Sequence, residues 1–205
     1  MHIFDISEKG QPLNKAAKAL ILLHGRGSNA LDIMELANEF CDASFYIAAP
    51  QATKNRWYPK DFMAEERLNE PWLSSALDVV KRLIDETAEY IPTDKIYLMG
   101  FSQGACLALE TASRFATKYG GIVAFSGGLI GKTIDEKKYG GDFQGTKVFI
   151  GVSEKDPHIP LIRVKESKKL MEKLGAKVIL KVYEGNGHTI TDDEINQVKK
   201  NIFYV

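Results

Sequence analysis

A serine at position 102 stands in a sequence context that could make its hydroxyl reactive. Residues 100–104 read G-F-S-Q-G, after the apolar run at 96–99 and before the small and apolar residues 105–110. This order predicts a strand, a sharp turn and a helix, which together hold a serine hydroxyl out at the end of the strand. Glycines two residues to either side let strand and helix approach closely. We therefore take Ser102 as a candidate nucleophile.

A serine nucleophile needs a histidine that takes its proton and a carboxylate that orients the histidine. After a strand–turn–helix serine, the expected chain order is Ser, then Asp or Glu, then His. His2 lies at the terminus and is interpreted as a surface residue, and His24 precedes the serine. His158 and His188 both follow it. We favour His188, in a glycine-flanked loop after the last expected strand, and keep His158 as the alternative.

The carboxylate is expected at the end of the strand before the last one. Asp156 follows the strand expected at 147–150, and Pro157 stiffens its loop. Glu154 is a competing acid on the same turn. The alternative for Asp156 is a turn aspartate that bonds its own backbone.

Acyl transfer also needs two backbone donors for the oxygen that becomes negative in the tetrahedral intermediate. The N–H of Gln103, directly after the serine, is one candidate, and the N–H of Arg26 is the other. Gly25 and Gly27 flank Arg26 and let that loop approach a substrate. A glycine loop could instead bind phosphate, but neither common nucleotide-binding pattern is present.

The elements that must position these residues follow from the apolar pattern. The continuous apolar run at 19–23 is typical of a strand covered on both faces, and further strands are expected at 45–49, 96–99, 122–125, 147–150 and 178–183. A short edge strand is expected at 2–6, and helical spacing links most of the strands. Pro71 is expected as the first residue of a helix, and Thr191 with Glu194 predicts a capping box. Residues 50–70 and 129–145 are expected to be irregular. The chain is thus predicted to be a single α/β domain, residues 1–205, with a largely parallel sheet and helices on both faces.

Composition excludes several classes of partner. Lys plus Arg and Asp plus Glu number 27 each, so the net charge is zero and no basic field would attract nucleic acid or an anionic membrane. We see neither a secretory signal nor an apolar run of the ~20 residues that a membrane span needs. Cys41 and Cys106 are the only cysteines, without metal-ligand spacing. A cytoplasmic protein with two buried free thiols is expected.

Four motifs carry a resemblance to a known family. L-L-H-G-R-G, G-F-S-Q-G-A, S-E-K-D-P-H-I-P and Y-E-G-N-G-H, in this order and spacing, resemble the carboxylesterase/phospholipase family of α/β-hydrolases, which includes acyl-protein thioesterases and small bacterial carboxylesterases. The similarity runs from about residue 17 to the end. It implies an α/β-hydrolase fold, with Ser102 as nucleophile, Asp156 as orienting acid and His188 as general base. It also implies an oxyanion hole of the Arg26 and Gln103 N–H groups, and no metal or organic cofactor.

The loops around the expected site depart from the eukaryotic acyl-protein thioesterases. Those proteins carry an apolar residue after His-Gly, where this chain has Arg26. Its side chain could attract an anionic acyl group or pair with a nearby acid at the surface. Trp57 and Tyr58 are candidates to line the acyl pocket, with ordinary core packing as the alternative. No lid-sized insertion interrupts the expected sheet, so no separate cap domain is predicted.

The resulting hypothesis is a serine carboxylesterase for small to medium esters, with thioesters and lysophospholipids as further candidates. The expected partner is a small ester, with no nucleic acid and no stable membrane anchor, and a homodimer is left open. A ligand-binding protein without activity on the same fold is the main alternative. A peptidase and a dienelactone hydrolase are weaker alternatives. The latter would use a cysteine nucleophile, whereas Cys106 lies one helical turn past the serine, where it is expected to be core.

Overall fold

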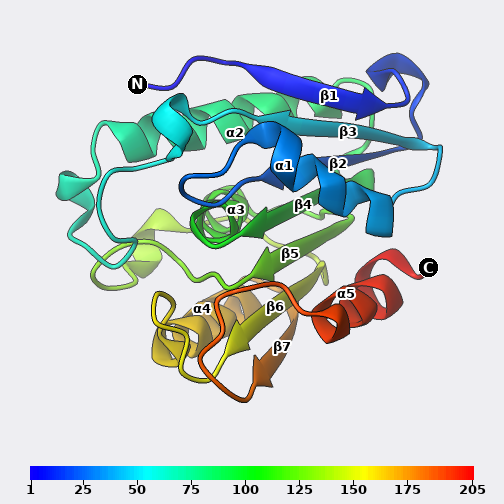
Figure 1. The fold of residues 1–205 in the computed structure, drawn as a ribbon. Helices are drawn as coiled ribbons and strands as arrows, with labels where there is room; N and C mark the ends of the chain where they lie inside the picture. Colours follow the sequence, from blue (N-terminus) through cyan, green and yellow to red (C-terminus); the bar gives the residue numbers. More distant parts are fainter.

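The computed structural model describes residues 1–205 and contains one seven-stranded sheet (Figure 1). The strand order is β1-β3-β2-β4-β5-β6-β7. The strands are β1 (Ile6–Gly10), β2 (Lys18–Leu23), β3 (Phe45–Pro50), β4 (Ile96–Phe101), β5 (Gly121–Phe125), β6 (Lys147–Ser153) and β7 (Lys177–Tyr183). Only β1 runs antiparallel to its neighbour, and all other pairs are parallel. The predicted mostly parallel sheet is confirmed.

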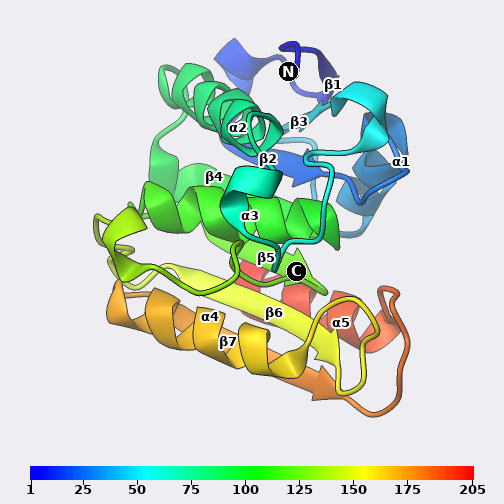
Figure 2. The ribbon, with the colours of Figure 1, turned by 90° about the vertical axis from the view of Figure 1, so that its left-hand side faces the viewer.

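Helices cover both faces of this sheet, as predicted. The α-helices are α1 (Ala30–Met34), α2 (Trp72–Ala88), α3 (Gln103–Arg114), α4 (Leu161–Lys173) and α5 (Asp192–Val198). Figure 2 shows α2, α3 and α4 along one face and α1 and α5 on the other. The first face covers a core of 40 buried residues and the second a core of 17. The segments between strands contain no inserted domain, and none of the helices is both long and apolar enough to cross a membrane.

The β2 strand shows why its sequence is continuously apolar. Residues Ala19, Ile21 and Leu23 face the larger core, whereas Leu20 and Leu22 face the smaller one. All five are 0 % exposed. Because successive side chains of a strand point to opposite faces, a strand covered by helices on both sides needs apolar residues at every position.

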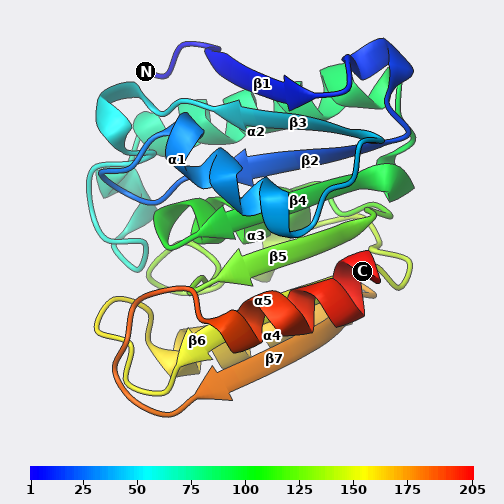
Figure 3. The ribbon, with the colours of Figure 1, turned by 45° about the vertical axis from the view of Figure 1, so that its right-hand side comes forward.

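The carboxyl ends of the parallel strands lie along one edge of the molecule. In Figure 3, β2, β5 and β7 point the same way and β1 points the opposite way. The loops after β2, β4, β6 and β7 therefore share that edge, which is where sheets of this kind place their functional residues. These are the loops that contain Arg26, Ser102, Asp156 and His188.

The structure corrects the expected edge strand at 2–6, because the first strand begins only at Ile6. The backbone N–H of His2 instead donates to Ser75 Oγ on α2 at 2.9 Å. The His2 ring contacts Trp72 and Trp57, with centroids 5.3 and 5.6 Å apart. His2 is therefore half-buried and not the surface residue that its terminal position suggested.

The helix boundaries agree closely with the turn and cap signals. Pro71 is the residue before α2, one position earlier than expected. Thr191 and Glu194 form the predicted capping box of α5. The helix continues as a π-helical turn, Lys199–Phe203, which buries Ile202 and Phe203 in the smaller core.

Candidate active site

Ser102 lies on a strained turn between β4 and α3. Its backbone has φ 53° and ψ −118°, a conformation that residues other than glycine rarely adopt. The two flanking glycines are required by close packing. A Cβ at Gly100 would lie 2.4 Å from the carbonyl oxygen of Gly104, and a Cβ at Gly104 would lie 2.1 Å from that of Leu23. The local sequence thus brings strand, turn and helix close enough to hold the Ser102 side chain at the end of the sheet.

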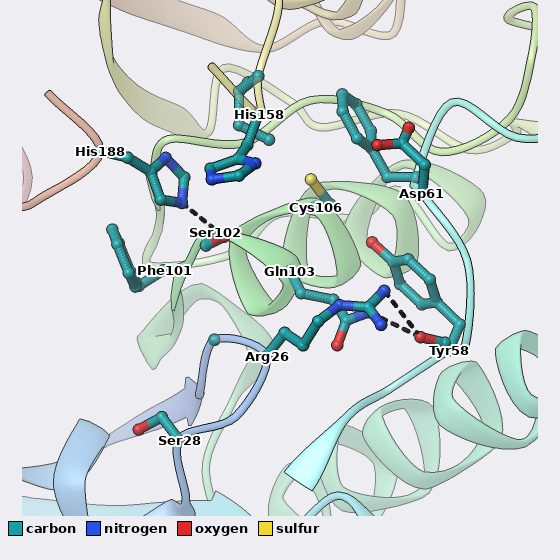
Figure 4. Close-up of a pocket in the computed structure, with 13 residues that line it drawn as sticks. Arg26, Ser28, Tyr58, Asp61, Phe101, Ser102, Gln103, Cys106, His158 and His188 are labelled. Atoms are coloured by element: carbon teal, nitrogen blue, oxygen red, sulfur yellow. Dashed lines mark hydrogen bonds between the residues drawn. The ribbon is translucent and has the colours of Figure 1, made fainter. Parts of the chain in front are cut away.

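The ring of His188 lies directly beside Ser102. Its Nε2 is 2.8 Å from Ser102 Oγ, and Figure 4 shows the two side chains pointing toward one another. His188 comes from the loop after β7, and its side chain is 19 % exposed. It also packs against Phe101, with ring centroids 5.2 Å apart. The histidine is therefore accessible from solvent but fixed in orientation.

Asp156 binds the opposite nitrogen of the same ring. Its Oδ2 is 2.8 Å from His188 Nδ1, and its Oδ1 accepts hydrogen bonds from the backbone N–H groups of His158 and Ile159 at 2.8 and 3.0 Å. Burial opposes the charge of this carboxylate, but these hydrogen bonds outweigh burial and hold the pKa of Asp156 below its ordinary value. A charged Asp156 favours the tautomer with hydrogen on Nδ1, which leaves Nε2 free to accept the Ser102 proton.

The competing acid and base stay outside this hydrogen-bonded chain. Glu154 is exposed, and its backbone N–H pairs with Tyr183 of β7. His158 is also exposed, and its ring meets that of His188 edge-on with centroids 4.8 Å apart. The structure thus brings Asp156 and His188 to Ser102, whereas Glu154 and His158 lie beside them.

The loop after β2 lies against the serine turn. A Cβ at Gly25 would lie 3.6 Å from Ser102 Cβ. The backbone N–H groups of Arg26 and Gln103 donate no hydrogen bond within the protein. Gln103 is the first residue of α3, where helix geometry leaves the amide unpaired. Both amides are thus available to bind an oxygen of a substrate.

His24 shapes this loop. It is 0 % exposed, and its Nδ1 lies 2.8 Å from the carbonyl oxygen of Gly25. Its Nε2 accepts from the N–H of Ala52 at 3.1 Å, so Nδ1 carries the hydrogen and donates. Burial lowers the pKa of His24, which favours this neutral form. His24 therefore connects the loop to the segment after β3.

A cavity of about 310 Å³ opens beside Ser102. Its lining consists of Gly25, Arg26, Ser28, Tyr58, Asp61, Phe62, Phe101, Ser102, Gln103, Cys106, His158, Ile159 and His188. Of the two aromatic residues expected there, Tyr58 lines the cavity and Trp57 does not. Trp57 is 0 % exposed, and its indole N–H donates to the carbonyl oxygen of His24 at 2.9 Å. Trp57 thus packs behind the cavity wall.

The Arg26 side chain is not paired with an acid, which was one of the two settings considered for it. Its guanidinium donates instead to the backbone carbonyls of Tyr58, Pro59 and Lys60. The Gln103 side chain contacts the same segment, donating to Tyr58 O at 2.9 Å and accepting from the N–H of Trp57 at 2.8 Å. These contacts of the Arg26 and Gln103 side chains could not be predicted from the sequence, because they depend on how residues 50–70 fold.

Cys106, Phe62 and Ile159 are among the residues that line the cavity but were not predicted as site residues. Cys106 follows Ser102 by one helical turn, a spacing that places it beneath the serine. It is buried as expected, and burial raises the pKa of its thiol to about 12. No group of three or more His, Cys, Asp or Glu side chains is arranged to hold a metal ion.

Comparison with known proteins identifies relatives over the whole chain. A family model described as phospholipase/carboxylesterase matches residues 4–205. A crystal structure of a phospholipase/carboxylesterase from Dyadobacter fermentans is 48 % identical, with a TM-score of 0.96, and the match covers 98 % of this chain and 97 % of that one. The Bacillus cereus carboxylesterase structure shares the fold at 22 % identity and a TM-score of 0.76, over 95 % of this chain and 91 % of that one.

Curated relatives are more distant. An acyl-protein thioesterase 1 from Eremothecium gossypii is 27 % identical over 96 % of this chain and 92 % of its own length. Another from Debaryomyces hansenii is 34 % identical over 58 % of this chain. In that second match the chain spans about half the length of the relative, 52 %.

Proposed function

The chain belongs to the phospholipase/carboxylesterase family of hydrolases, and we propose that it hydrolyses small to medium carboxylic esters through an acyl-enzyme on Ser102. The observation that carries this proposal is the chain of hydrogen bonds from Asp156 through His188 to Ser102, with 2.8 Å between the bonded atoms at each step. It joins three loops that follow three different strands of the sheet. Such a chain is what a serine needs to attack a carbonyl group at neutral pH.

In the first half-reaction, Ser102 Oγ bonds to the carbonyl carbon of the ester while His188 Nε2 takes the hydroxyl proton. The carbonyl oxygen becomes negative, and the free N–H groups of Arg26 and Gln103 stabilise it. Asp156 stabilises the charged imidazole. The bond to the leaving alcohol then breaks, and His188 returns its proton to the alcohol oxygen.

The second half-reaction repeats these steps with water. His188 removes a proton from water as the water oxygen bonds to the acyl carbon. The same two N–H groups bind the new oxyanion. The bond to Ser102 Oγ breaks, the serine regains its proton from His188, and the carboxylic acid leaves.

The cavity suggests which esters fit. A volume of about 310 Å³ has room for a short to medium acyl group. Phe62, Phe101 and Ile159 supply apolar surface for it, beside polar groups such as Tyr58 and Asp61. Because curated relatives are named acyl-protein thioesterases, thioesters are the second substrate class, with lysophospholipids as a third.

The test is hydrolysis of p-nitrophenyl esters from acetyl to decanoyl, with matched thioesters. We expect Ser102→Ala to lower turnover by roughly 10⁴-fold or more. Ser7→Ala is the matched control, because Ser7 lies on the edge strand β1, far along the sheet from β4. Equal rates for Ser102→Ala and wild type would contradict the proposal and favour a ligand-binding protein without activity.

A further inference from the structure

Arg26 and Gln103, the two residues proposed to form the oxyanion hole, are linked through hydrogen bonds of their side chains to one common acceptor. Nη2 of Arg26 lies 3.0 Å from the carbonyl oxygen of Tyr58, and Nε2 of Gln103 lies 2.9 Å from that same oxygen. One carbonyl therefore accepts a hydrogen bond from each of them. Figure 4 shows both side chains reaching toward Tyr58 along one side of the cavity.

Further bonds hold the Arg26 loop against residues 55–60. The Arg26 guanidinium also donates to Pro59 O at 3.0 Å and to Lys60 O at 2.6 Å. The backbone N–H of Gly27, the next residue, donates to Asn55 O at 2.7 Å. Residues 55–60 thus hold the loop after β2 both through the Arg26 side chain and through the backbone of Gly27.

This arrangement matters because the Arg26 N–H lies on a loop, whereas the Gln103 N–H lies on a helix. The helix α3 fixes Gln103 through its own hydrogen bonds. Arg26 lies in no helix, so its backbone is held only through hydrogen bonds of neighbouring residues, such as those of Gly25 O with His24 and of Gly27 N–H with Asn55. The glycines on either side give this backbone more conformational freedom than a helix allows. An oxyanion hole stabilises charge only when its donors are held in place before the reaction.

We propose that the Arg26 side chain is a positioning residue for the oxyanion hole: by binding the carbonyls of residues 58–60 it holds its own backbone N–H in register with that of Gln103. This inference rests on the proposed ester hydrolysis. An arginine suits the role, because its planar guanidinium carries five donors and can bind several carbonyls at once. A lysine has one nitrogen and cannot span the three carbonyls in the same way.

The inference predicts a loss in kcat with little change in KM. The oxyanion forms only during the reaction, so a misplaced donor weakens transition-state binding and spares substrate binding. Removing an oxyanion donor outright costs about 10²- to 10³-fold, and a loosened one should cost less. For Arg26→Ala we expect kcat for p-nitrophenyl acetate to fall by roughly 10- to 100-fold.

The experiment compares Arg26→Ala, Arg26→Lys and Arg56→Ala. Arg56 is an exposed arginine of the neighbouring segment, so its removal is the control for lost charge. For each protein we would measure kcat and KM for neutral and anionic esters, the melting temperature, and inhibition by a trifluoromethyl ketone. That ketone forms a tetrahedral oxyanion with an active serine. Its inhibition constant should rise by the same factor as kcat/KM falls, and added guanidinium ions should restore part of the rate of Arg26→Ala.

Arg26→Lys should retain the fold and still lose most of the kcat, so it carries the test if Arg26→Ala fails to fold. A wild-type kcat in both Arg26 variants would overturn the inference. The proposed hydrolysis would still stand in that case, provided that Ser102→Ala is inactive. A rise in KM for anionic esters alone, with kcat unchanged, would also overturn it and make Arg26 a substrate-binding residue. An inactive wild-type protein would overturn the proposed function and the inference together.

Discussion

Nε2 of His188 and Oγ of Ser102 lie 2.8 Å apart, although 86 residues separate them in the chain. The sheet accounts for this proximity, because Ser102 follows β4 and His188 follows β7 at the same edge. The loop after β7 extends back across β6 and β5 to reach the serine. The arrangement predicts that changes to either residue, or to the groups that hold them, should affect activity in specific ways.

The first prediction separates the two acids near the histidine. Asp156→Asn should lower kcat by about 10³- to 10⁴-fold, because an amide cannot stabilise the imidazolium or select the tautomer with hydrogen on Nδ1. Glu154→Gln should leave kcat near wild type, since Glu154 is exposed. Steady-state kinetics with a p-nitrophenyl ester measures both. Equal losses in the two variants would contradict the assignment of Asp156.

The second prediction separates the two histidines. His188→Gln should lower kcat by about 10⁴-fold or more, because the base is lost. His158→Gln should retain most of kcat, and its effect should be seen in KM because His158 lines the cavity. Active-site titration gives the fraction of competent enzyme in each sample. A His158→Gln variant as inactive as His188→Gln would require a second essential base.

A third prediction concerns the close approach beneath the serine. In Gly104→Ala the new Cβ would lie 2.1 Å from the Leu23 carbonyl oxygen, so β2 and α3 must move apart. We expect a loss of about 3 kcal/mol or more in the free energy of unfolding, at the upper end of overpacking. Gly140→Ala is the control, because a Cβ there meets nothing within 4 Å. Urea unfolding of both variants is the measurement, and a Gly104→Ala protein as stable as the control would contradict the packing described.

The fourth prediction concerns stability in mild acid. Burial lowers the pKa of His24 below its ordinary 6.5, so the unfolded chain binds more protons at this site just below pH 6.5. Stability should therefore fall as the pH is lowered from about 7 to 5. The depressed pKa of Asp156 adds a loss only below its ordinary value of 3.8.

The matched variant is His24→Gln, which cannot titrate. Its melting temperature should fall less than that of wild type over the same pH range, even if it is lower throughout. Subtracting the change in melting temperature of His24→Gln from that of wild type removes the contributions of other groups. One such group is Glu110, whose pKa is raised by burial. Parallel curves for wild type and His24→Gln would show that His24 does not contribute to the pH dependence.

Much of the fold was predictable because its signals are local. The continuous apolar run at β2 and the capping box at Thr191 each depend on a few neighbouring residues, and the structure contains both elements. The edge strand was misplaced because His2 and Phe4 pack on α2. The centroid of the Phe4 ring lies 3.9 Å from Cζ of Arg82 on that helix. Such long-range contacts have no local signature.

The candidate site likewise contains residues that local signals predict and residues that they do not. Ser102, Asp156 and His188 each follow the carboxyl end of an expected parallel strand, which was enough to propose that they meet at one edge of the sheet. The roles of the Arg26 and Gln103 side chains depend on residues 50–70, where Lys54 and Asn55 adopt positive φ. No periodic pattern predicts such a path. For the same reason Trp57 and Tyr58 could not be distinguished as buried residue and cavity wall.

The most direct test of a reactive serine is labelling with a fluorophosphonate, followed by peptide mass spectrometry. We expect a single covalent adduct on Ser102, absent from Ser102→Ala and much slower to form in His188→Gln. No adduct on the wild-type protein, or one on a different serine, would contradict the central claim that His188 and Asp156 activate Ser102.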